Sequence, residues 1–165
     1  MKRILAILVE DRPGVLARVS GLFSRRGYNI QNIAVGRTLE PGISRMTVTL
    51  EADPVTLEQI IKQLNKLVNV IKVGDMTEEP SVGRELMLLK VRAEPEFRSD
   101  IQQMVETFRA RIIDISPDSM IVEVTGDEDK LQAFTLMMQE FGIKEVVSTG
   151  NIALLRGGKV TRDVR

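Results

Sequence analysis

The stretch ILAILVEDRPGVL, residues 4–16, decides how the chain begins to fold. Its first six residues, Ile4 to Val9, are all apolar, which is typical of a strand buried on both faces of a sheet. Two acidic residues follow, and Pro13-Gly14 then marks a turn into a helix, because proline is tolerated in the first turn. The stretch therefore predicts a buried strand, a tight loop and a helix.

The hydrophobic periodicity downstream completes a unit with the order βαββαβ. Apolar residues recur at helical spacing in two segments, residues 14–26 and 55–67. Strand patterns occupy residues 30–39, 46–50 and 68–73, with a turn at Glu40-Pro41-Gly42. This order of elements predicts a ferredoxin-like unit over residues 1–76.

The second half repeats this order of elements after a polar segment. Residues 77–83, TEEPSVG, contain both proline and glycine and are expected to be a linker. Strand patterns then occupy residues 85–91, 112–115, 120–124, 143–147 and 152–155, and helical patterns occupy residues 97–108 and 131–141. The basic tail from Arg156 is expected to be frayed. We therefore expect an α+β protein with a second ferredoxin-like domain over residues 84–165.

Composition argues against several classes of protein. The 165 residues include 23 lysines and arginines and 23 aspartates and glutamates, so no basic excess is available for nucleic acid or an anionic membrane. The chain has no cysteine and no histidine, which removes thiolate chemistry and the usual proton shuttle near neutral pH. Its one tyrosine is Tyr28, and its five phenylalanines fall on predicted helices, which leaves central strands without stacking aromatics for RNA. We expect a non-catalytic protein with no metal site.

The amino-terminal apolar run does not resemble a targeting segment. It is six residues long and ends at Glu10-Asp11, whereas a signal peptide needs a longer apolar region and a small-residue cleavage site. No apolar run approaches the roughly 20 residues of a membrane span. We therefore expect a cytoplasmic protein.

The loop after the first strand has the features of an anion receptor. Backbone N–H groups of Gly14, Val15 and Leu16 are expected to point outward at the positive end of a helix, where a carboxylate would bind. Glycine at position 14 lets another molecule approach the backbone. Asp11, just before it, would attract an ammonium group.

A second polar segment, Asn29-Ile30, follows Gly27 at the start of the next strand. Asn29 can both donate and accept hydrogen bonds. If the two segments are neighbours in the unit, the set Asp11, Gly14, Val15, Leu16, Asn29 and Ile30 suits an amino acid with an aliphatic side chain. Local roles are equally adequate: Asp11 as a helix cap, Pro13-Gly14 as a tight turn and Asn29 as a turn residue. The residues alone favour these local roles.

Two families share these motifs. EDRPGVL, residues 10–16, with GYNI, residues 27–30, resembles the signature of ACT domains, which are small-molecule sensors. Further segments resemble the small subunit of acetolactate synthase: LFSRRGYNI (22–30), SRMT (44–47), QLNKL (63–67), RELMLLKV (84–91), IIDI (112–115) and GNIAL (150–154). These segments follow the family's order across almost the whole chain, with residues 1–76 as the ACT amino-acid-binding domain.

The resemblance implies a regulatory role. In this family the effector, commonly valine, binds between the ACT domains of two protomers, and by resemblance Gly14 and Asn29 are the central contacts. Some members have asparagine where this chain has Asp11. The partner would be the large catalytic subunit, a transferase that uses thiamine diphosphate, magnesium and a flavin, none of which is expected to bind this chain. The resemblance implies that this chain raises the partner's activity and confers feedback inhibition.

Two other classes of function share features with this sequence. A free-standing amino-acid sensor needs only the ACT module, so the second half of the chain argues against it. A small ferredoxin-fold enzyme or RNA-binding module is disfavoured by the absent histidine and cysteine and by the missing stacking aromatics. We also expect homodimers through the ACT sheets, because open sheet edges favour association.

Overall fold

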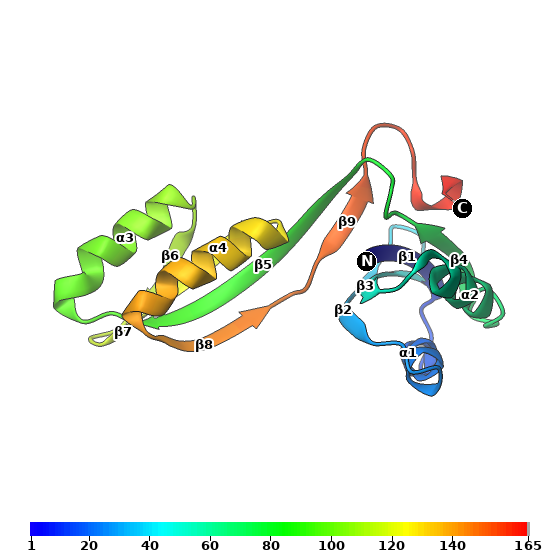
Figure 1. Ribbon diagram of the computed structural model, residues 1–165, viewed down its shortest axis with the longest axis horizontal. Coiled ribbons are helices and arrows are strands. Elements are labelled where there is room, and N and C mark those ends of the chain that lie inside the picture. Colours follow the sequence, from blue (N-terminus) through cyan, green and yellow to red (C-terminus); the bar gives the residue numbers. More distant parts are fainter. Residues whose placement is uncertain (165) are drawn as a thin grey trace. The chain divides into compact units, whose positions relative to one another are not determined.

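The computed structural model describes residues 1–164, and its contacts divide the chain into two compact units. Unit 1 comprises Met1–Val82 together with the segment that begins at Ile152, and unit 2 comprises Gly83–Asn151. Figure 1 shows the elements of both. Within residues 1–164, no helix has the length and apolar character needed to cross a bilayer.

Unit 1 begins with the six elements that the sequence predicts. They are β1 (Lys2–Glu10), α1 (Val15–Arg25), β2 (Ile30–Arg37), β3 (Ile43–Glu51), α2 (Pro54–Leu64) and β4 (Val70–Asp75). The four strands form an antiparallel sheet in the order β2-β3-β1-β4, which leaves β2 at one edge. This is the expected ferredoxin-like arrangement.

The central strand β1 is buried on both faces, as its continuous apolar run predicts. Leu5, Ile7 and Val9 belong to the core beneath the two helices, while Ala6 faces the opposite side of the sheet. The five residues from Leu5 to Val9 are each at most 7% exposed. Strand β1 therefore contributes side chains to apolar clusters on both faces of the sheet.

Local sequence explains where both helices begin. Helix α1 starts after Gly14 and buries Val15, Val19, Leu22 and Phe23 along one face. At α2, the Asp53 side chain accepts a hydrogen bond from the Thr56 N–H at 3.0 Å, and Pro54 occupies the first turn. Both helices pack on one face of the sheet in a single core.

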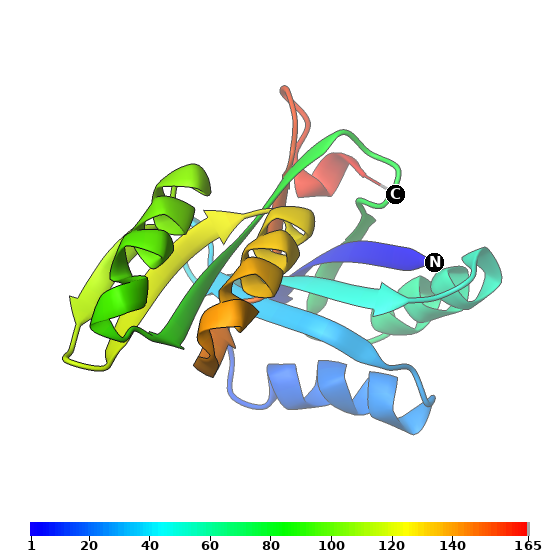
Figure 2. The same ribbon diagram turned by 60° about the vertical axis from the view of Figure 1, so that its left-hand side comes forward.

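The other face of the unit 1 sheet contacts the end of the chain. Strand β9 (Ile152–Leu155) and the short helix η3 (Thr161–Asp163) return to unit 1, and Ala153 joins Ala6 and Met76 in a small apolar cluster. Figure 2 shows η3 in red, and the amino terminus belongs to the same unit.

Arg45, on β3, holds this returning segment. Its guanidinium donates to the Ala153 carbonyl at 2.6 Å and to the Thr161 hydroxyl at 3.3 Å. It also donates to the Thr47 hydroxyl at 2.9 Å, and burial lowers the pKa of the Arg45 guanidinium from its ordinary value. Among the described residues, no carboxylate forms an ion pair with Arg45, so carbonyl and hydroxyl oxygens satisfy its donors.

Unit 2 repeats the βαββαβ order. Its elements are β5 (Ser81–Arg92), α3 (Arg98–Thr107), β6 (Arg111–Ile115), β7 (Ser119–Gly126), α4 (Glu128–Met138) and β8 (Ile143–Ser148), with short helices η1 (Pro95–Phe97) and η2 (Gln139–Phe141). The strands run in the order β6-β7-β5-β8. Helices α3 and α4 lie on the same side of this sheet (Figure 1), and Ile101, Phe134 and Met138 are fully buried beneath them.

The structure differs in two places from the linker and the chain end expected from the sequence. Residues 81–83 were expected to be linker, but they begin β5, because a strand can continue through Gly83 when it is paired. The tail from Arg156 was expected to be frayed, but Thr161 and Val164 are buried against unit 1. The carbonyl of Thr161 approaches β4 closely enough that a Cβ on Gly74 would lie 3.1 Å from it.

Candidate functional site

The loop between β1 and α1 is fixed by backbone hydrogen bonds. The Asp11 N–H donates to the Gly42 carbonyl at 2.8 Å, which ties this loop to the turn before β3. Gly14 has φ +84° and ψ −8°, a left-handed conformation that favours glycine. A Cβ at Gly14 would meet nothing within 4 Å, so the space above this residue is open within the chain.

The helix start offers fewer free donors than the sequence suggests. The Val15 N–H was expected to face a ligand, but it donates to the Arg12 carbonyl at 3.3 Å. Within residues 1–164, no acceptor is found for the N–H groups of Gly14 and Leu16. Gly14 and Leu16 are therefore among the donors that an anion can reach at this helix end.

The side chains of this segment have different exposures. Val15 is buried in the core, so its side chain is not available to a ligand. Leu16 is 47% exposed on the outer face of α1 and can supply an apolar contact. The segment thus presents backbone donors, one aliphatic side chain and the carboxylate of Asp11.

Asp11 has an ion-pair partner that no sequence motif indicates. The Arg37 guanidinium, at the end of β2, donates to Asp11 Oδ2 at 2.9 Å. The pair combines opposite charges that match the carboxylate and ammonium groups of a zwitterion. Arg37 ends the strand that follows Asn29, so its place in β2 could be predicted. The pairing of β2 with its neighbours could not be predicted from sequence alone, and so its closeness to Asp11 could not either.

A second polar network supports the same end of the sheet. Asn69 donates to Glu10 Oε2 at 2.7 Å and accepts from the Arg18 guanidinium at 2.6 Å. The Glu10 N–H also donates to the Asn69 carbonyl at 2.9 Å. These bonds hold the end of β1 against α1 and the start of β4.

The second predicted segment follows the other end of α1. Gly27 has φ +68°, and the Tyr28 N–H donates to the Phe23 carbonyl at 3.0 Å, which closes the helix. Asn29 is exposed, and Ile30 packs partly against the core as β2 begins. Asn29 is therefore accessible to another molecule.

The two segments are not neighbours within one unit, so a single copy does not bring Asn29 to the Asp11–Leu16 loop. Helix α1 has 11 residues and separates them by about 16 Å along its axis. Strand β3 gives a second measure of the distance between the two segments. The Asp11 N–H bonds Gly42 just before β3 begins, while Ile30 pairs with Leu50 near the opposite end of β3. Eight residues of strand span about 27 Å. One copy of the chain cannot close a small-molecule site with both segments.

The fold and these segments define a class: an ACT unit followed by a second ferredoxin-like unit. Residues 5–72 match the ACT domain described as like that of the AHAS (acetohydroxyacid synthase) small subunit. Residues 84–157 match the family described as the small subunit of acetolactate synthase. The two matches follow each other along the chain, as in the expected domain order.

Full-length relatives agree with both matches. A probable acetolactate synthase small subunit of Archaeoglobus fulgidus is 55% identical over 96% of this chain and 99% of that protein. The acetolactate synthase small subunit of Mycobacterium bovis is 52% identical over 93% of this chain and 91% of its own length. A crystal structure of the small subunit from Thermotoga maritima superposes with a TM-score of 0.88 at 40% identity, covering 96% of this chain and 99% of that one. The chain therefore belongs to the acetolactate synthase small-subunit family.

Proposed function

We propose that this chain is the non-catalytic regulatory subunit of an acetolactate synthase. It binds a branched-chain amino acid between two copies of unit 1, and valine is the first candidate. One observation carries the proposal: the two polar segments lie at opposite ends of the edge strand β2. Two-fold pairing of this edge would bring one segment from each copy together.

The geometry of such a pair follows from the strand. An isologous antiparallel pair centred between Ile33 and Ala34 of β2 sets Ile30 of one copy opposite Arg37 of the other. Arg37 is bonded to Asp11, so Asn29 of one copy would face the Asp11–Leu16 loop of the second copy. Val35 and Leu39 are exposed at this edge, and such an association would cover them.

The chemistry of this combined site suits an aliphatic zwitterion. Backbone N–H groups of Gly14 and Leu16 would bind the carboxylate, and Asp11 would attract the ammonium group. Asn29 from the second copy would bridge the two charged groups, and Leu16 with Ile30 would contact the side chain. The resulting two sites per dimer are equivalent by symmetry.

The proposed partner is the catalytic large subunit, which would hold thiamine diphosphate, magnesium and flavin in the cytoplasm. The small-subunit names of the relatives support such a partner. This chain would raise the activity of that partner, and valine would reverse the effect by binding one state of the complex more tightly than the other.

A complementation experiment tests the two-copy site. Gly14→Asp places a negative charge against the ligand carboxylate, and Asn29→Leu removes the bridging amide, so each variant alone should not bind valine. In a mixed dimer, one site carries both substitutions and the other carries neither. After subunit exchange, calorimetric titration should recover about a quarter of the wild-type sites, because half of the dimers are mixed.

The control mixes two preparations of Gly14→Asp, which should recover no sites. Recovery of no sites in the mixed sample, with dimers confirmed by sedimentation, would place the whole site in one copy and contradict the proposal. Acetolactate formation by the catalytic subunit, with and without valine, tests regulation: both single variants should still activate but resist feedback.

A further inference from the structure

Unit 1 also has a cavity away from the Asp11–Leu16 loop. A cavity of about 520 Å³ opens between the carboxyl-terminal ends of α1 and α2. Its lining residues are cationic or neutral and polar: Arg26, Tyr28, Gln59, Lys62, Gln63, Asn65 and Lys66. The volume falls within the range of about 300–1,000 Å³ that is usual for organic ligands.

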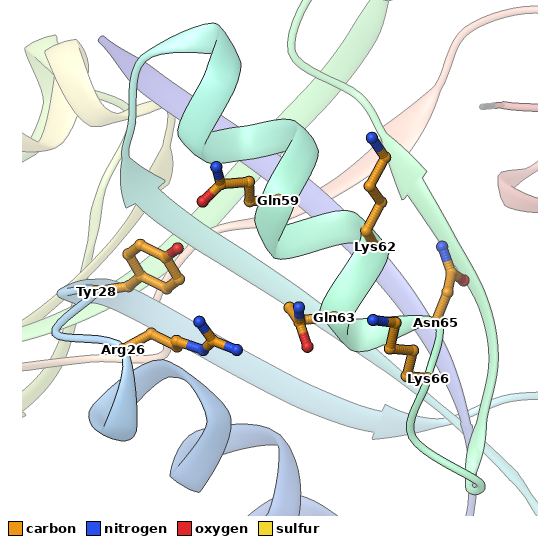
Figure 3. Close-up of a pocket in the computed structure, with 7 residues that line it drawn as sticks. All are labelled: Arg26, Tyr28, Gln59, Lys62, Gln63, Asn65 and Lys66. Carbon is orange, nitrogen blue, oxygen red and sulfur yellow. The ribbon is translucent and has the colours of Figure 1, made fainter.

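The cations of this cavity differ in their availability. Figure 3 shows Arg26 and Lys66 extending from opposite sides toward Gln63. Lys62 points away from them, and its ammonium group bonds Glu58 at 2.7 Å one turn earlier on α2. Within residues 1–164, neither Arg26 nor Lys66 has a carboxylate partner. Two positive charges therefore face the cavity without neutralisation.

The helix ends favour these positive charges but do not neutralise them. Cations commonly compensate free carbonyls at a helix carboxyl terminus. Here the backbone already supplies donors: the Arg26 N–H donates to the Phe23 carbonyl at 3.2 Å, and the Lys66 N–H donates to the Gln63 carbonyl at 3.2 Å. The side chains of Arg26 and Lys66 are exposed and are not needed as donors to these two carbonyls, so they are available to a ligand.

The sequence around the cavity lacks acidic residues on both sides. Residues 12–39 contain five arginines and no aspartate or glutamate, and residues 59–74 contain three lysines and no acid, although the whole chain carries equal numbers of each charge. Arg12 and Arg37 pair with Glu10 and Asp11 away from the cavity, so the positive charge that attracts anions to it comes from Arg26 and Lys66.

We propose that this cavity binds a small molecule that carries a phosphate group. A phosphate presents several acceptor oxygens, and it can bridge the Arg26 fork and the Lys66 ammonium group. The carboxamides of Gln59, Gln63 and Asn65 supply neutral donors around it. The half-buried ring of Tyr28 offers a flat surface for the organic part, since the cavity exceeds the size of one phosphate.

The chain contains its own probe for this site. Tyr28 is its single tyrosine, and no tryptophan is present, so tyrosine fluorescence reports on this cavity. We would titrate the full-length protein with glycerol phosphate and, separately, with pyrophosphate at constant ionic strength, and follow fluorescence and calorimetric heat. Saturation by the first assigns a phosphate ester, and saturation by the second assigns an inorganic phosphate.

Variants test which side chains are responsible. Arg26→Gln and Lys66→Gln should each weaken the binding about tenfold, whereas Arg25→Gln, which removes the same charge from the adjacent position, should change it less than about twofold. Circular dichroism would verify folding of all three. No saturable binding of either compound, or equal weakening by all three variants, would overturn the proposal. Saturation by a polyglutamate peptide alone would also overturn it, because the cavity would then serve a protein contact.

Discussion

At the scale of single residues, Gly14 combines a structural and a proposed binding role that have to be separated. Its positive φ costs any other residue about 1–2 kcal/mol, whether or not a ligand binds there. Gly157 offers a matched control, since it also has positive φ, +71°, and open space at its Cβ position.

We predict that Gly14→Ala and Gly157→Ala lower the free energy of unfolding by similar amounts, about 1–2 kcal/mol each. Only Gly14→Ala should also weaken valine binding, because its methyl group projects into the proposed site. Denaturant unfolding and calorimetric titration measure the two effects. Equal valine affinity in both variants would mean that Gly14 only shapes the turn.

The Asp11–Arg37 ion pair leads to a second prediction. Asp11→Asn keeps the shape of the side chain but removes the charge proposed to attract the ligand ammonium, so valine affinity should fall about tenfold. Asp114→Asn, on unit 2, removes an equal charge from an exposed position and should leave affinity unchanged. Unchanged binding by Asp11→Asn would remove Asp11 from the proposed site.

At the scale of elements, one arginine of β3 forms part-buried polar bonds to the returning segment, beside the apolar cluster of Ala153 and the pairing of β9 with β5. Surface ion pairs also link it, Arg162 with Glu40 at 2.7 Å and Lys159 with Glu79 at 2.8 Å, but such pairs contribute little. The shorter and less exposed bond from Arg45 to Ala153 is therefore expected to dominate.

We predict that Arg45→Met lowers the free energy of unfolding by about 1–3 kcal/mol, because carbonyl and hydroxyl acceptors lose a charged donor. Hydrogen exchange should quicken at residues 153–164 before it does so in α1. Arg84→Met is the control, since the Arg84 guanidinium is exposed and, within residues 1–164, bonds only the adjacent Gly83 carbonyl. Unaltered exchange in the segment would show that apolar packing alone holds it.

Most elements could be predicted from the sequence, because each has a strong period. The alternation around Met46 and Val48 indicated β3, and the stripe through Leu57 and Ile60 indicated α2, both with ends shifted by a few residues. The return of residues 161–164 could not be predicted, because four residues carry no period and their contacts are distant in sequence. The candidate site could be predicted only as two separate segments for the same reason. Local motifs identified Gly14 and Asn29 but gave no measure of the distance between them.

At the scale of the whole molecule, unit 2 is inserted between two parts of unit 1. The insertion starts and ends at one place: a Cβ on Gly83 would lie 3.0 Å from Asn151 Oδ1, and the Arg156 N–H donates to the Pro80 carbonyl at 2.8 Å. Since its two ends are so close, unit 2 should be removable without separating the parts of unit 1.

We predict that a chain in which a short glycine-rich turn replaces residues 84–150 still folds as unit 1 and binds valine. A fragment that ends at Met76 keeps the helix-side core but loses Ala153 from the opposite face, so it should unfold at lower denaturant concentration. If the fragment proves as stable as the turn variant, the returning segment contributes nothing to unit 1.

The same insertion determines the order in which the nascent chain can fold on the ribosome. The helix-side core needs no residue beyond Val73, so it can form early, while the apolar face around Ala6 and Met76 must wait for Ala153. The intervening residues 83–151 take roughly 3–14 s to synthesise at about 5–20 residues per second. During that interval one face of the first sheet lacks its covering segment, which is when a chaperone would meet this protein.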